Sequence, residues 1–393
     1  MRTMADLEAT LQPFVDSGDI PGLVALVARG DDVEVVALGT RDSGGTPMGR
    51  DALFRGASIT KPVTAALTMA LVEDGRIDLD APVADLLPEL AELRVLRTLD
   101  GPLDDTVGCD RPITARHLLT GTAGHGFCTW ESAVTPLLME RLHQAADDIH
   151  EVPAPDEWMR RLATIPLMHQ PGDGWTYNAS FDVLGVLISR AAGKDLADAM
   201  AERLLEPLGM TDTGFHVPAD KIDRLTTMYG ADDGVLVVRD DPDGAFVRAP
   251  AFASGAGGLV TTADDWLAFG RMLLAGGSAV LGQESVRLMT TDHTTPQHRE
   301  MGGFFLDGQG WGFGGGVDTA LVDPWNVVGR YGWVGGTGTS AYVHPDGTVA
   351  ILLTQVVLGS PGVEDLLKAF WTATAHPVGR LSAPRASLPW THD

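Results

Sequence analysis

Cysteine is scarce in this sequence, which limits the covalent cross-links that the fold can contain. Only Cys109 and Cys128 occur among 393 residues, so at most one disulfide is possible, and two free thiols are the simpler prediction. The apolar content of 44% is ample for a substantial core. The length fits one large domain or two intimate ones, and no internal repeat or long low-complexity linker is visible.

Positive charge is also scarce, because 28 Lys and Arg residues stand against 53 Asp and Glu residues, for a formal charge of −25. This excess of acid opposes binding to nucleic acid or to an anionic membrane, and neither partner is expected. The acidic residues are spread along the chain, which favours a solvated surface. Attraction of a cationic substrate is the alternative, and the salt dependence of KM separates the two.

No apolar run reaches the length that a membrane-spanning helix needs. The N-terminal stretch MRTMADLEATLQPFVDSG has an amphipathic helical pattern that includes acidic residues. It lacks the unbroken apolar segment and the small-residue cleavage site of a secretion signal. A cytoplasmic location is therefore expected, unless an export signal has been removed.

Several common catalytic signatures are missing as well. The sequence has no G-x-S-x-G, the nucleophile elbow of α/β-hydrolases. Gly310, Gly312 and Gly315 have dinucleotide-fingerprint spacing, but no strand precedes them and no helix follows, so a loop and strand edge is predicted. His293 and His298 lack further ligands nearby, which predicts surface histidines in a polar loop. We expect neither a metal nor a cofactor.

The hydrophobic pattern predicts strands at both ends of the chain and helices in the middle. GLVALVAR and VEVVALGT flank residues 30–32, and TSAYVHP and TVAILLTQ flank residues 346–347, so each pair is expected to form a hairpin. A final amphipathic helix is predicted from Val363. Helical periodicity closed by glycine is found in ITARHLLTG, DVLGVLISRAAG and LADAMAERLLEPLG.

These elements predict an α+β fold, in which both ends of the chain form one antiparallel sheet flanked by helices. Residues 1–80 and 240–393 would form this discontinuous sheet domain. Residues 81–239 would form an inserted, mainly helical domain.

The stretch FRGASITKPVTA places Ser58 and Lys61 three residues apart, with a proline directly behind the lysine. Proline is tolerated only in the first turn of a helix, so a helix must begin close to Ser58. The periodic run VTAALTMALVEDG carries it to about Asp74, with Gly75 as a cap. Residues three apart share a face, so the hydroxyl and the amine are expected to be neighbours at the partly positive end of the helix.

A serine and a lysine at this spacing also occur by chance, and a capping serine with a solvated lysine is the alternative to a functional pair. The flanks FRGA and PVTAAL are apolar or small, which favours function. Partial desolvation there lowers the pKa of Lys61 from its reference of about 10.4 and makes the neutral amine accessible. Lys61 is then able to take the proton of Ser58.

With these residues, the sequence resembles the serine β-lactamase and penicillin-binding-protein superfamily over nearly the whole chain. The matching segments are ASITKPVTAALTMALVEDGRIDLDAPVADLLPEL, ITARHLLTGTAG, EPLGMTDTGF and ASGAGGLVTTADDWLAFG. The resemblance implies an α/β sandwich beside an all-α region, with the active site between them. This agrees with the architecture that the patterns predict.

The second family motif supplies a tyrosine, as Y-x-N or, in the esterase branch, as Y-S-x. In WTYNASFDVLG the matching residue is Tyr177. Asn178 follows it directly, whereas the asparagine of Y-x-N stands two residues after the tyrosine. The resemblance implies that Tyr177 shares the general-base role with Lys61. The alternative is an aromatic residue in the core beside Trp175. The altered spacing counts against β-lactam chemistry, and we place Asn178 among the candidate substrate-binding residues.

The third family motif, usually K-T-G or H-x-G on a strand that lines the site, aligns with residues 333–335 in GRYGWVGGTGTSAYVHP. A lysine there pairs with the carboxylate of β-lactams, whereas Trp333 cannot, and W-x-G resembles the family VIII carboxylesterases. Gly335 and Gly336 let the strand approach a substrate closely. The resemblance implies an oxyanion hole formed by the N–H groups of Ser58 and Gly336.

Together these residues predict a serine hydrolase that works through an acyl-enzyme on small uncharged esters. Ser58 attacks, Lys61 and Tyr177 move protons, and water resolves the intermediate. Trp333 and Gly335 are expected to bind the substrate, with simple strand packing as the alternative for the tryptophan.

Other functions on the same site are an acyltransferase, an amide or D-amino peptide hydrolase, and a weak β-lactamase. For the last of these, Arg330 would have to point into the site and bind a carboxylate. A binding module that keeps the fold and has lost turnover is the alternative outside enzymes. The expected partner is a small-molecule ester or amide, and no oligomeric state is predicted.

Overall fold

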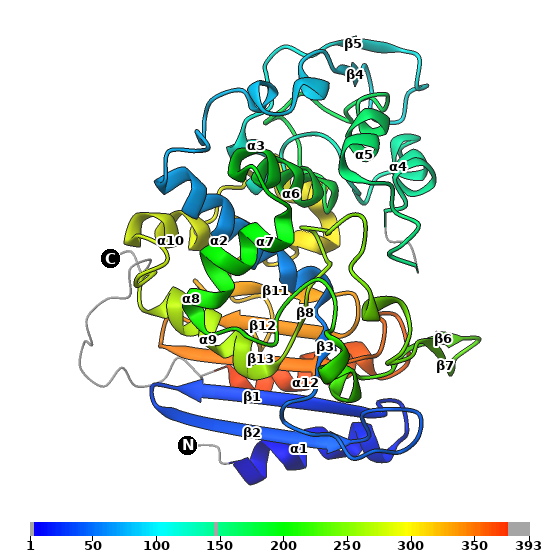
Figure 1. Cartoon of the computed structure of the whole chain (residues 1–393), viewed down its shortest axis with the longest axis vertical. Coiled ribbons are helices and arrows are strands. Elements are labelled where there is room, and N and C mark those ends of the chain that lie inside the picture. The colour runs from blue at the N-terminus through cyan, green and yellow to red at the C-terminus, as the bar shows by residue number, and fades with distance from the viewer. Residues whose placement is uncertain (1–3, 145–147, 376–393) are drawn as a thin grey trace.

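The computed structural model describes residues 4–144 and 148–375 (Figure 1). Its centre is an antiparallel sheet with the strand order β2-β1-β13-β12-β11-β10-β9. The strands of this sheet are β1 (Gly22–Arg29), β2 (Asp32–Gly39), β9 (Gln309–Trp311), β10 (Gly316–Asp318), β11 (Tyr331–Gly335), β12 (Thr339–Val343) and β13 (Thr348–Thr354). The first two strands of the chain therefore join strands from its last quarter, which confirms the predicted fold class.

Both predicted hairpins of the sheet are confirmed. β1 and β2 pair with Arg29 opposite Asp32, around a turn in which Gly30 has φ +62°. β12 and β13 pair with Val343 opposite Val349. β1 also pairs with β13, and these two interior strands are almost entirely buried, which explains why both appear in the sequence as continuous apolar runs.

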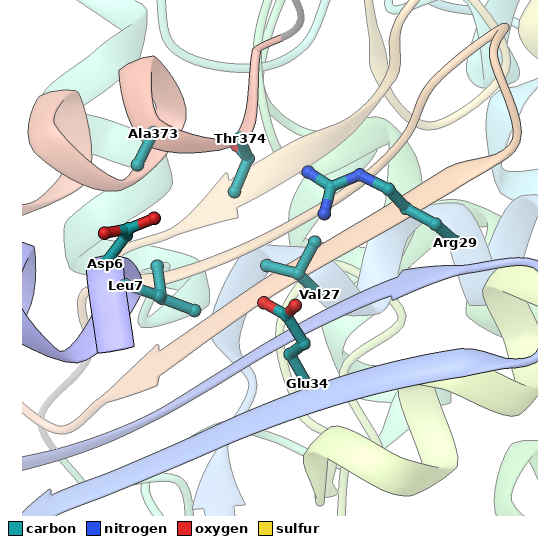
Figure 2. Close-up of a pocket in the computed structure, with 7 residues that line it drawn as sticks. All are labelled: Asp6, Leu7, Val27, Arg29, Glu34, Ala373 and Thr374. Atoms are coloured by element: carbon teal, nitrogen blue, oxygen red, sulfur yellow. The ribbon is translucent and has the colours of Figure 1, made fainter. Parts of the chain in front are cut away.

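Two amphipathic helices from opposite ends of the chain cover one face of the sheet. They are α1 (Met4–Asp16) and α12 (Val363–Thr374), and they lie side by side against β1 and β13. Leu11 of α1 and Phe370 of α12 are fully buried in this layer. Figure 2 shows a small hollow between these helices and the first hairpin, lined by Asp6, Leu7, Val27, Arg29, Glu34, Ala373 and Thr374.

Helices α2 (Thr60–Glu73) and α9 (Ala263–Leu274) pack on the other face. A Cβ atom on Gly270 of α9 would lie 2.8 Å from Val349, so glycine permits the close approach of this helix to β13. The remaining helices are α3 (Ala115–Leu119), α4 (Val134–Leu142), α5 (Pro155–Leu162), α6 (Ala179–Ala192), α7 (Leu196–Met200), α8 (Glu206–Leu208), α10 (Gln283–Thr290) and α11 (Pro296–Gly302).

The middle of the chain gathers above the sheet in Figure 1, where α3 to α6 lie with the small strands β4 (Arg94–Leu96) and β5 (Thr106–Gly108). Helix α6 packs directly against α2, so this mainly helical part adjoins the helix that begins after Ser58. The division at residues 80 and 240 stays a prediction.

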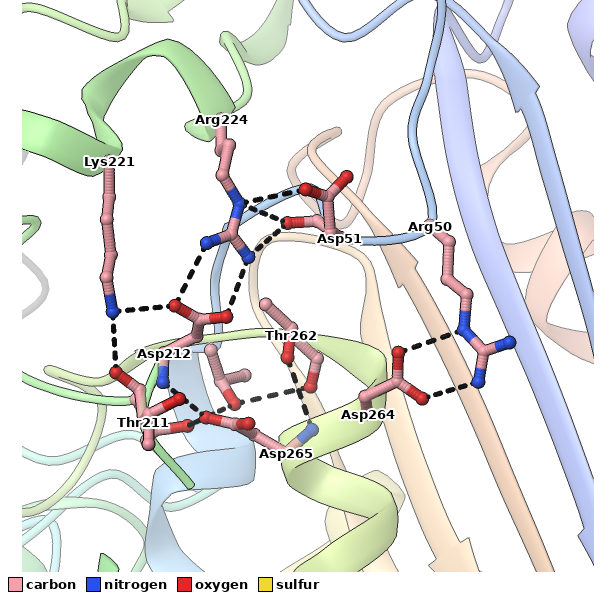
Figure 3. A network of polar contacts seen from close by, with 11 residues as sticks. Arg50, Asp51, Thr211, Asp212, Lys221, Arg224, Thr262, Asp264 and Asp265 are labelled. Carbon is pink, nitrogen blue, oxygen red and sulfur yellow. Dashed lines mark hydrogen bonds and ion pairs between the residues drawn. The ribbon is translucent and has the colours of Figure 1, made fainter. Parts of the chain in front are cut away.

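Among the described residues, three strand pairs lie outside the central sheet: β4 with β5, β3 (Phe54–Arg55) with β8 (Val260–Thr261), and β6 (Met228–Asp232) with β7 (Val235–Asp240). A polar network anchors the chain just before β3 (Figure 3). Arg224 bonds the main-chain oxygen of Asp51 and both carboxylate oxygens of Asp212, and Arg50 makes a bidentate pair with Asp264 of α9. These contacts fix the path of the chain that leads to Ser58.

The prediction for the histidines is wrong at His298. This residue is buried, because it caps the start of α11: its Nδ1 accepts from the N–H of Thr295, and its Nε2 bonds the carbonyl oxygen of Gly172. His293 is half-buried and stacks on Phe313 with ring centroids 4.6 Å apart. Both imidazoles thus have structural partners that are far away in the sequence.

The glycine-rich stretch forms the short strands β9 and β10 at the edge of the sheet, as predicted. Cys109 and Cys128 are both free thiols, as predicted. Across residues 4–144 and 148–375, no cluster of three or more His, Cys, Asp or Glu side chains suits a metal ion. Within the same ranges, no helix is long and apolar enough to cross a membrane.

Candidate active site

Ser58 lies in a 3₁₀ turn, Ala57–Ile59, that leads directly into α2. The helix therefore begins where the proline requires it to. Ala57 has φ +46°, a left-handed conformation that is unusual for alanine and that carries backbone strain. The turn is held by the N–H of Gly56, which donates to the carbonyl oxygen of Leu259 at 2.7 Å. The serine is thus presented at a tight corner between β3 and α2.

Lys61 is completely buried, and its Nζ lies within hydrogen-bond distance of three oxygen atoms. These are Ser58 Oγ at 2.8 Å, Asn178 Oδ1 at 2.8 Å and the carbonyl oxygen of Ala256 at 2.7 Å. Burial lowers the pKa of Lys61 to about 7 because desolvation disfavours the ammonium form, and the negative charge of Asp182 opposes this shift. At neutral pH a large share of Lys61 is therefore the free amine.

The three partners of Lys61 determine where its lone pair points. A neutral amine has two N–H bonds and one lone pair. The oxygens of Asn178 and Ala256 are carbonyl oxygens, which only accept hydrogen bonds. When they take both N–H groups, the lone pair is left facing Ser58 Oγ. This is the geometry of a base that removes the proton of a serine.

Tyr177 lies just before α6 and reaches the same two residues. Its ring centroid is 4.5 Å from Lys61 Nζ, and its hydroxyl group makes hydrogen bonds with Ser58 and with the indole N–H of Trp333, the latter at 2.6 Å. Part of the side chain is exposed, but the hydroxyl group is enclosed, and this desolvation raises the pKa of Tyr177 to about 12 against the opposing effect of both hydrogen bonds. On raising the pH, the amine thus loses its proton long before the phenol does.

An aromatic cluster holds the ring of Tyr177. The ring stacks on Phe305 with centroids 4.5 Å apart and meets Trp311 edge-on at 6.2 Å. Trp175 lies 6.0 Å away, so the packing beside this residue that the alternative interpretation predicted is also present. The tyrosine is both packed in an aromatic cluster and bonded to Ser58, and the packing restricts where its hydroxyl group can point.

Trp333 belongs to this cluster from the side of the sheet. It lies on β11, is 3% exposed, and meets Trp311 edge-on with centroids 4.6 Å apart. Its single N–H donates to the oxygen of Tyr177. The residue therefore packs on the strand and also touches a candidate catalytic group, while contact with a substrate stays a prediction.

Arg330 does not share the face of Trp333. Its Nε lies 3.0 Å from Asp318 Oδ2, and its guanidinium lies 4.3 Å from the ring centroid of Tyr342. Tyr342 in turn meets Trp371 of α12 edge-on, so Arg330 lies on the side of the sheet that α12 covers. The guanidinium is thus paired away from Ser58.

Gly335, the last residue of β11, lies against the turn that carries Ser58. A Cβ atom on Gly335 would be 2.5 Å from the carbonyl oxygen of Gly56 and 2.1 Å from Thr339 Oγ1, so this approach requires glycine. Gly336 directly follows β11, and among the described residues its N–H donates to no backbone acceptor. The oxyanion hole stays a prediction, and this placement agrees with it.

Asn178 reaches Lys61 although it follows the tyrosine directly. Its backbone has φ +85° and ψ −71°, and the N–H of Ala179 donates to the carbonyl oxygen of Tyr177 at 3.3 Å. This is a γ-turn, a rare and strained conformation. It places the side-chain amide of Asn178 beside Lys61. Both ends of that amide have partners within the protein, and substrate binding by Asn178 stays a prediction.

Two buried residues next to this site were not identified from the sequence. Gln144 Oε1 accepts from Asn178 Nδ2 at 2.8 Å, and Gln144 Nε2 donates to Asp182 Oδ2 at 2.6 Å. The signal available for Asp182 was a lone acid at the start of the otherwise apolar run DVLGVLIS. Gln144 carries no such signal, because nothing in its neighbourhood in the sequence marks it.

Known proteins resemble this chain in sequence and in structure over most of its length. The family described as Beta-lactamase matches residues 7–369. Protein Rv1367c of Mycobacterium tuberculosis is 39% identical over 360 residues, and Esterase EstB of Burkholderia gladioli is 34% identical over 376 residues; the alignments cover 88% and 89% of both chains. A solved structure, EstCE1, described as a hydrolase with promiscuous acyltransferase activity, matches with a TM-score of 0.79 and 27% identity, covering 94% of this chain and 98% of its own.

Proposed function

The chain belongs to the beta-lactamase family, and from this premise we propose that it is a carboxylesterase that forms an acyl-enzyme on Ser58. The contacts of Lys61 carry the proposal. Its amine lies 2.8 Å from Ser58 Oγ, and two carbonyl oxygens are placed to accept its N–H groups. A pKa of about 7 makes that amine available at neutral pH.

The reaction follows from these positions. The free amine of Lys61 takes the proton of Ser58, and Oγ attacks the ester carbonyl carbon. The N–H groups of Ser58 and Gly336 bind the negative oxygen that forms, a contribution of about 3–4 kcal/mol for each donor. The ammonium of Lys61 and the hydroxyl group of Tyr177, which both bond Ser58, return that proton to the leaving alkoxide. Water then attacks the acyl-enzyme by the same route and releases the acid.

The distribution of charge supports an uncharged ester as the substrate. Trp333 stands where the family's lysine would bind a carboxylate, and its N–H is already bonded to Tyr177. Arg330 is ion-paired with Asp318 on the face of the sheet that α12 covers. Burying a substrate carboxylate beside Tyr177 without a cationic partner would cost several kcal/mol.

The test compares an ester with a β-lactam on the same purified protein. We expect kcat/KM for p-nitrophenyl butyrate to exceed that for nitrocefin by at least about 100-fold, the equivalent of about 2.7 kcal/mol. The Ser58→Ala variant provides the background rate for both substrates. Nitrocefin turnover comparable with that of the ester would show that the esterase assignment is wrong.

Acyl transfer is the second candidate function, because the structurally similar EstCE1 is described as a hydrolase with acyltransferase activity. Both functions use the same acyl-enzyme and differ only in the acceptor that resolves it. Adding an alcohol or an amine and measuring the partition between acid and new ester or amide separates them. A burst of p-nitrophenol without turnover would instead favour the acyl-binding module.

An exposed phenylalanine lies near the candidate site and favours an apolar substrate. Phe304 follows α11 and is 74% exposed, which is unusual for so large an apolar side chain. Its ring lies 4.2 Å from that of Phe305, which in turn stacks on Tyr177 at 4.5 Å. This aromatic row runs from the surface to the catalytic tyrosine, and we propose that it contacts the alkyl part of the substrate.

Replacing Phe304 with alanine is therefore expected to raise KM for p-nitrophenyl hexanoate by about five- to tenfold, through the loss of about 1–1.4 kcal/mol of apolar contact. The KM for the acetate, whose acyl chain has little apolar surface to bury, should change less than twofold by the same reasoning. Val235→Ala serves as the matched control, because this residue is 66% exposed on the β6–β7 hairpin. Equal changes for both esters would contradict the proposed contact.

A further inference from the structure

Asp182 is a buried carboxylate that the mechanism above does not use. It lies in the first turn of α6 and is 3% exposed. Its Oδ1 accepts from Ser254 Oγ at 2.7 Å and from the N–H of Ala256 at 3.2 Å, and its Oδ2 accepts from Gln144 Nε2 at 2.6 Å. The carboxyl group accepts all three bonds, which is the pattern that the ionised form requires.

One path from this carboxylate to Lys61 runs through two side-chain amides. Because Asp182 Oδ2 only accepts, Gln144 must turn its NH₂ towards it and its oxygen towards Asn178. Asn178 must then turn its own NH₂ towards Gln144 and its oxygen towards Lys61. The carboxylate thus fixes which end of the Gln144 amide faces it, and Gln144 in turn fixes the orientation of the Asn178 amide.

A second path runs through the backbone of one residue, Ala256. The N–H of Ala256 donates to Asp182 Oδ1, and the carbonyl oxygen of Ala256 accepts from Lys61 Nζ. Both carbonyl oxygens that Lys61 contacts therefore belong to residues that are hydrogen-bonded, directly or through Gln144, to the same carboxylate.

We propose that Asp182 and Gln144 are positioning residues, which hold two acceptor oxygens against Lys61 and thereby aim the lone pair of its amine at Ser58. This inference rests on the proposed function and deepens it, because it assigns the orientation of the base to a carboxylate that does not touch Ser58. Neither residue contacts the reacting atoms.

Asp182 also supplies the charge that faces Lys61. The other groups around Nζ are Ser58 from the start of α2, Asn178 and Tyr177 from before α6, and the Ala256 carbonyl group, and all are neutral at pH 7. Burial raises the pKa of Asp182, while its hydrogen bonds and the nearby Lys61 ammonium oppose that shift. The partly positive start of α6 further favours the carboxylate.

Asp182→Asn is the sharpest test, because asparagine keeps the shape and removes the charge. If its Oδ1 keeps Ser254 and the Ala256 N–H, its NH₂ faces Gln144. The amides of Gln144 and Asn178 then both have to turn over, and Asn178 presents its NH₂ group to the amine of Lys61.

The expected result has two parts. Loss of the negative charge and of an acceptor destabilises the ammonium form, so the pKa of Lys61 falls below its wild-type value of about 7. The rise of kcat/KM with pH should therefore move to lower pH by about 1 unit. Misdirection of the lone pair should lower kcat at the high-pH plateau of the profile by about 10- to 100-fold. KM should change little, as expected for a loss of general-base catalysis.

The measurements are the pH profile of kcat/KM for p-nitrophenyl butyrate and the pH dependence of fluorophosphonate inactivation. Asp265→Asn is the matched control. Asp265 is also a buried carboxylate; it accepts from the N–H of Asp212 and the hydroxyl group of Thr213 (Figure 3), and none of the three oxygens that Lys61 contacts belongs to this group. Its variant should lower stability and leave the midpoint and the plateau unchanged.

A second variant, Gln144→Met, removes the amide path and keeps the carboxylate. It should lower the plateau while moving the midpoint less than Asp182→Asn does, and it decides the question if the asparagine variant does not fold. Wild-type profiles in both variants would overturn the proposal. A wild-type protein that neither hydrolyses the ester nor reacts with the fluorophosphonate would overturn the proposed function itself. A reactive wild type with an unmoved midpoint and plateau in Asp182→Asn would overturn only the positioning role.

Discussion

Replacing Ser58 with alanine is expected to abolish labelling by a fluorophosphonate and to lower ester turnover on the order of 10⁶-fold, as removal of the nucleophile does in other serine hydrolases. The reason is that the acyl-enzyme can form on no other oxygen. Among the described residues, Lys61 Nζ contacts one hydroxyl oxygen, that of Ser58, and its other two partners are carbonyl oxygens.

The variant should remain folded, because Ser58 is only half-buried and its hydroxyl group belongs to a turn, Ala57–Ile59, held by backbone contacts. Circular dichroism and the melting temperature check this. Ser180→Ala is the matched control, because the hydroxyl group of Ser180 is buried near Asn178 and has no hydrogen-bond partner among the described residues. Activity or labelling that survives in Ser58→Ala would remove Ser58 from the mechanism.

Local signals in the sequence were sufficient for the start of α2. A proline can occupy only the first turn of a helix, and this rule requires no knowledge of the rest of the chain. The two hairpins were predictable for the same reason, because each is closed by a turn between two adjacent apolar runs. The spacing of Ser58 and Lys61 on one helix then placed the hydroxyl and the amine together.

The remaining parts of the site depend on backbone geometry and on contacts between distant segments. Asn178 was not expected beside Lys61, because it stands one residue away from the usual place of the asparagine. A γ-turn at that residue compensates for the difference. Gln144 lies 34 residues before Asn178 in the sequence, and no local pattern predicts a contact across that separation. The polarity of such an amide is visible only when its partners are known.

Orientation on a strand is a second limit of prediction from sequence. Arg330 precedes β11, and alternation could not decide which face it joins. The structure decides it through Asp318, which ion-pairs with Arg330, and through Tyr342, which lies under its guanidinium. His298 shows the same limit, because its burial depends on the carbonyl oxygen of Gly172.

Lys61 and Tyr177 are expected to act as one unit, so that losing both costs little more than losing the amine alone. Lys61→Met keeps the length of the side chain and removes the amine, and Tyr177→Phe keeps the ring in its aromatic cluster and removes the hydroxyl group. Loss of the amine should lower kcat/KM by about 10³- to 10⁴-fold, and loss of the hydroxyl group by about 10²-fold.

The non-additivity follows from shared contacts. Both groups bond Ser58, and Nζ lies 4.5 Å from the centroid of the tyrosine ring. With pKa values of about 7 and about 12, the amine is the group that is unprotonated at neutral pH, and the phenol needs the amine to recover the proton that it gives away. Without Lys61, the hydroxyl group of Tyr177 therefore has little left to contribute.

The measurement is a double-mutant cycle on kcat/KM for p-nitrophenyl butyrate, with the rate of fluorophosphonate inactivation as a second readout. Lys61→Met leaves the oxygens of Asn178 and Ala256 without their donor, so each variant's melting temperature must be recorded and the assays run well below it. Losses that multiply, giving about 10⁵- to 10⁶-fold in the double variant, would mean that the two residues act independently. The proton could not then pass between them, and Tyr177 would be assigned to holding the aromatic cluster around Ser58.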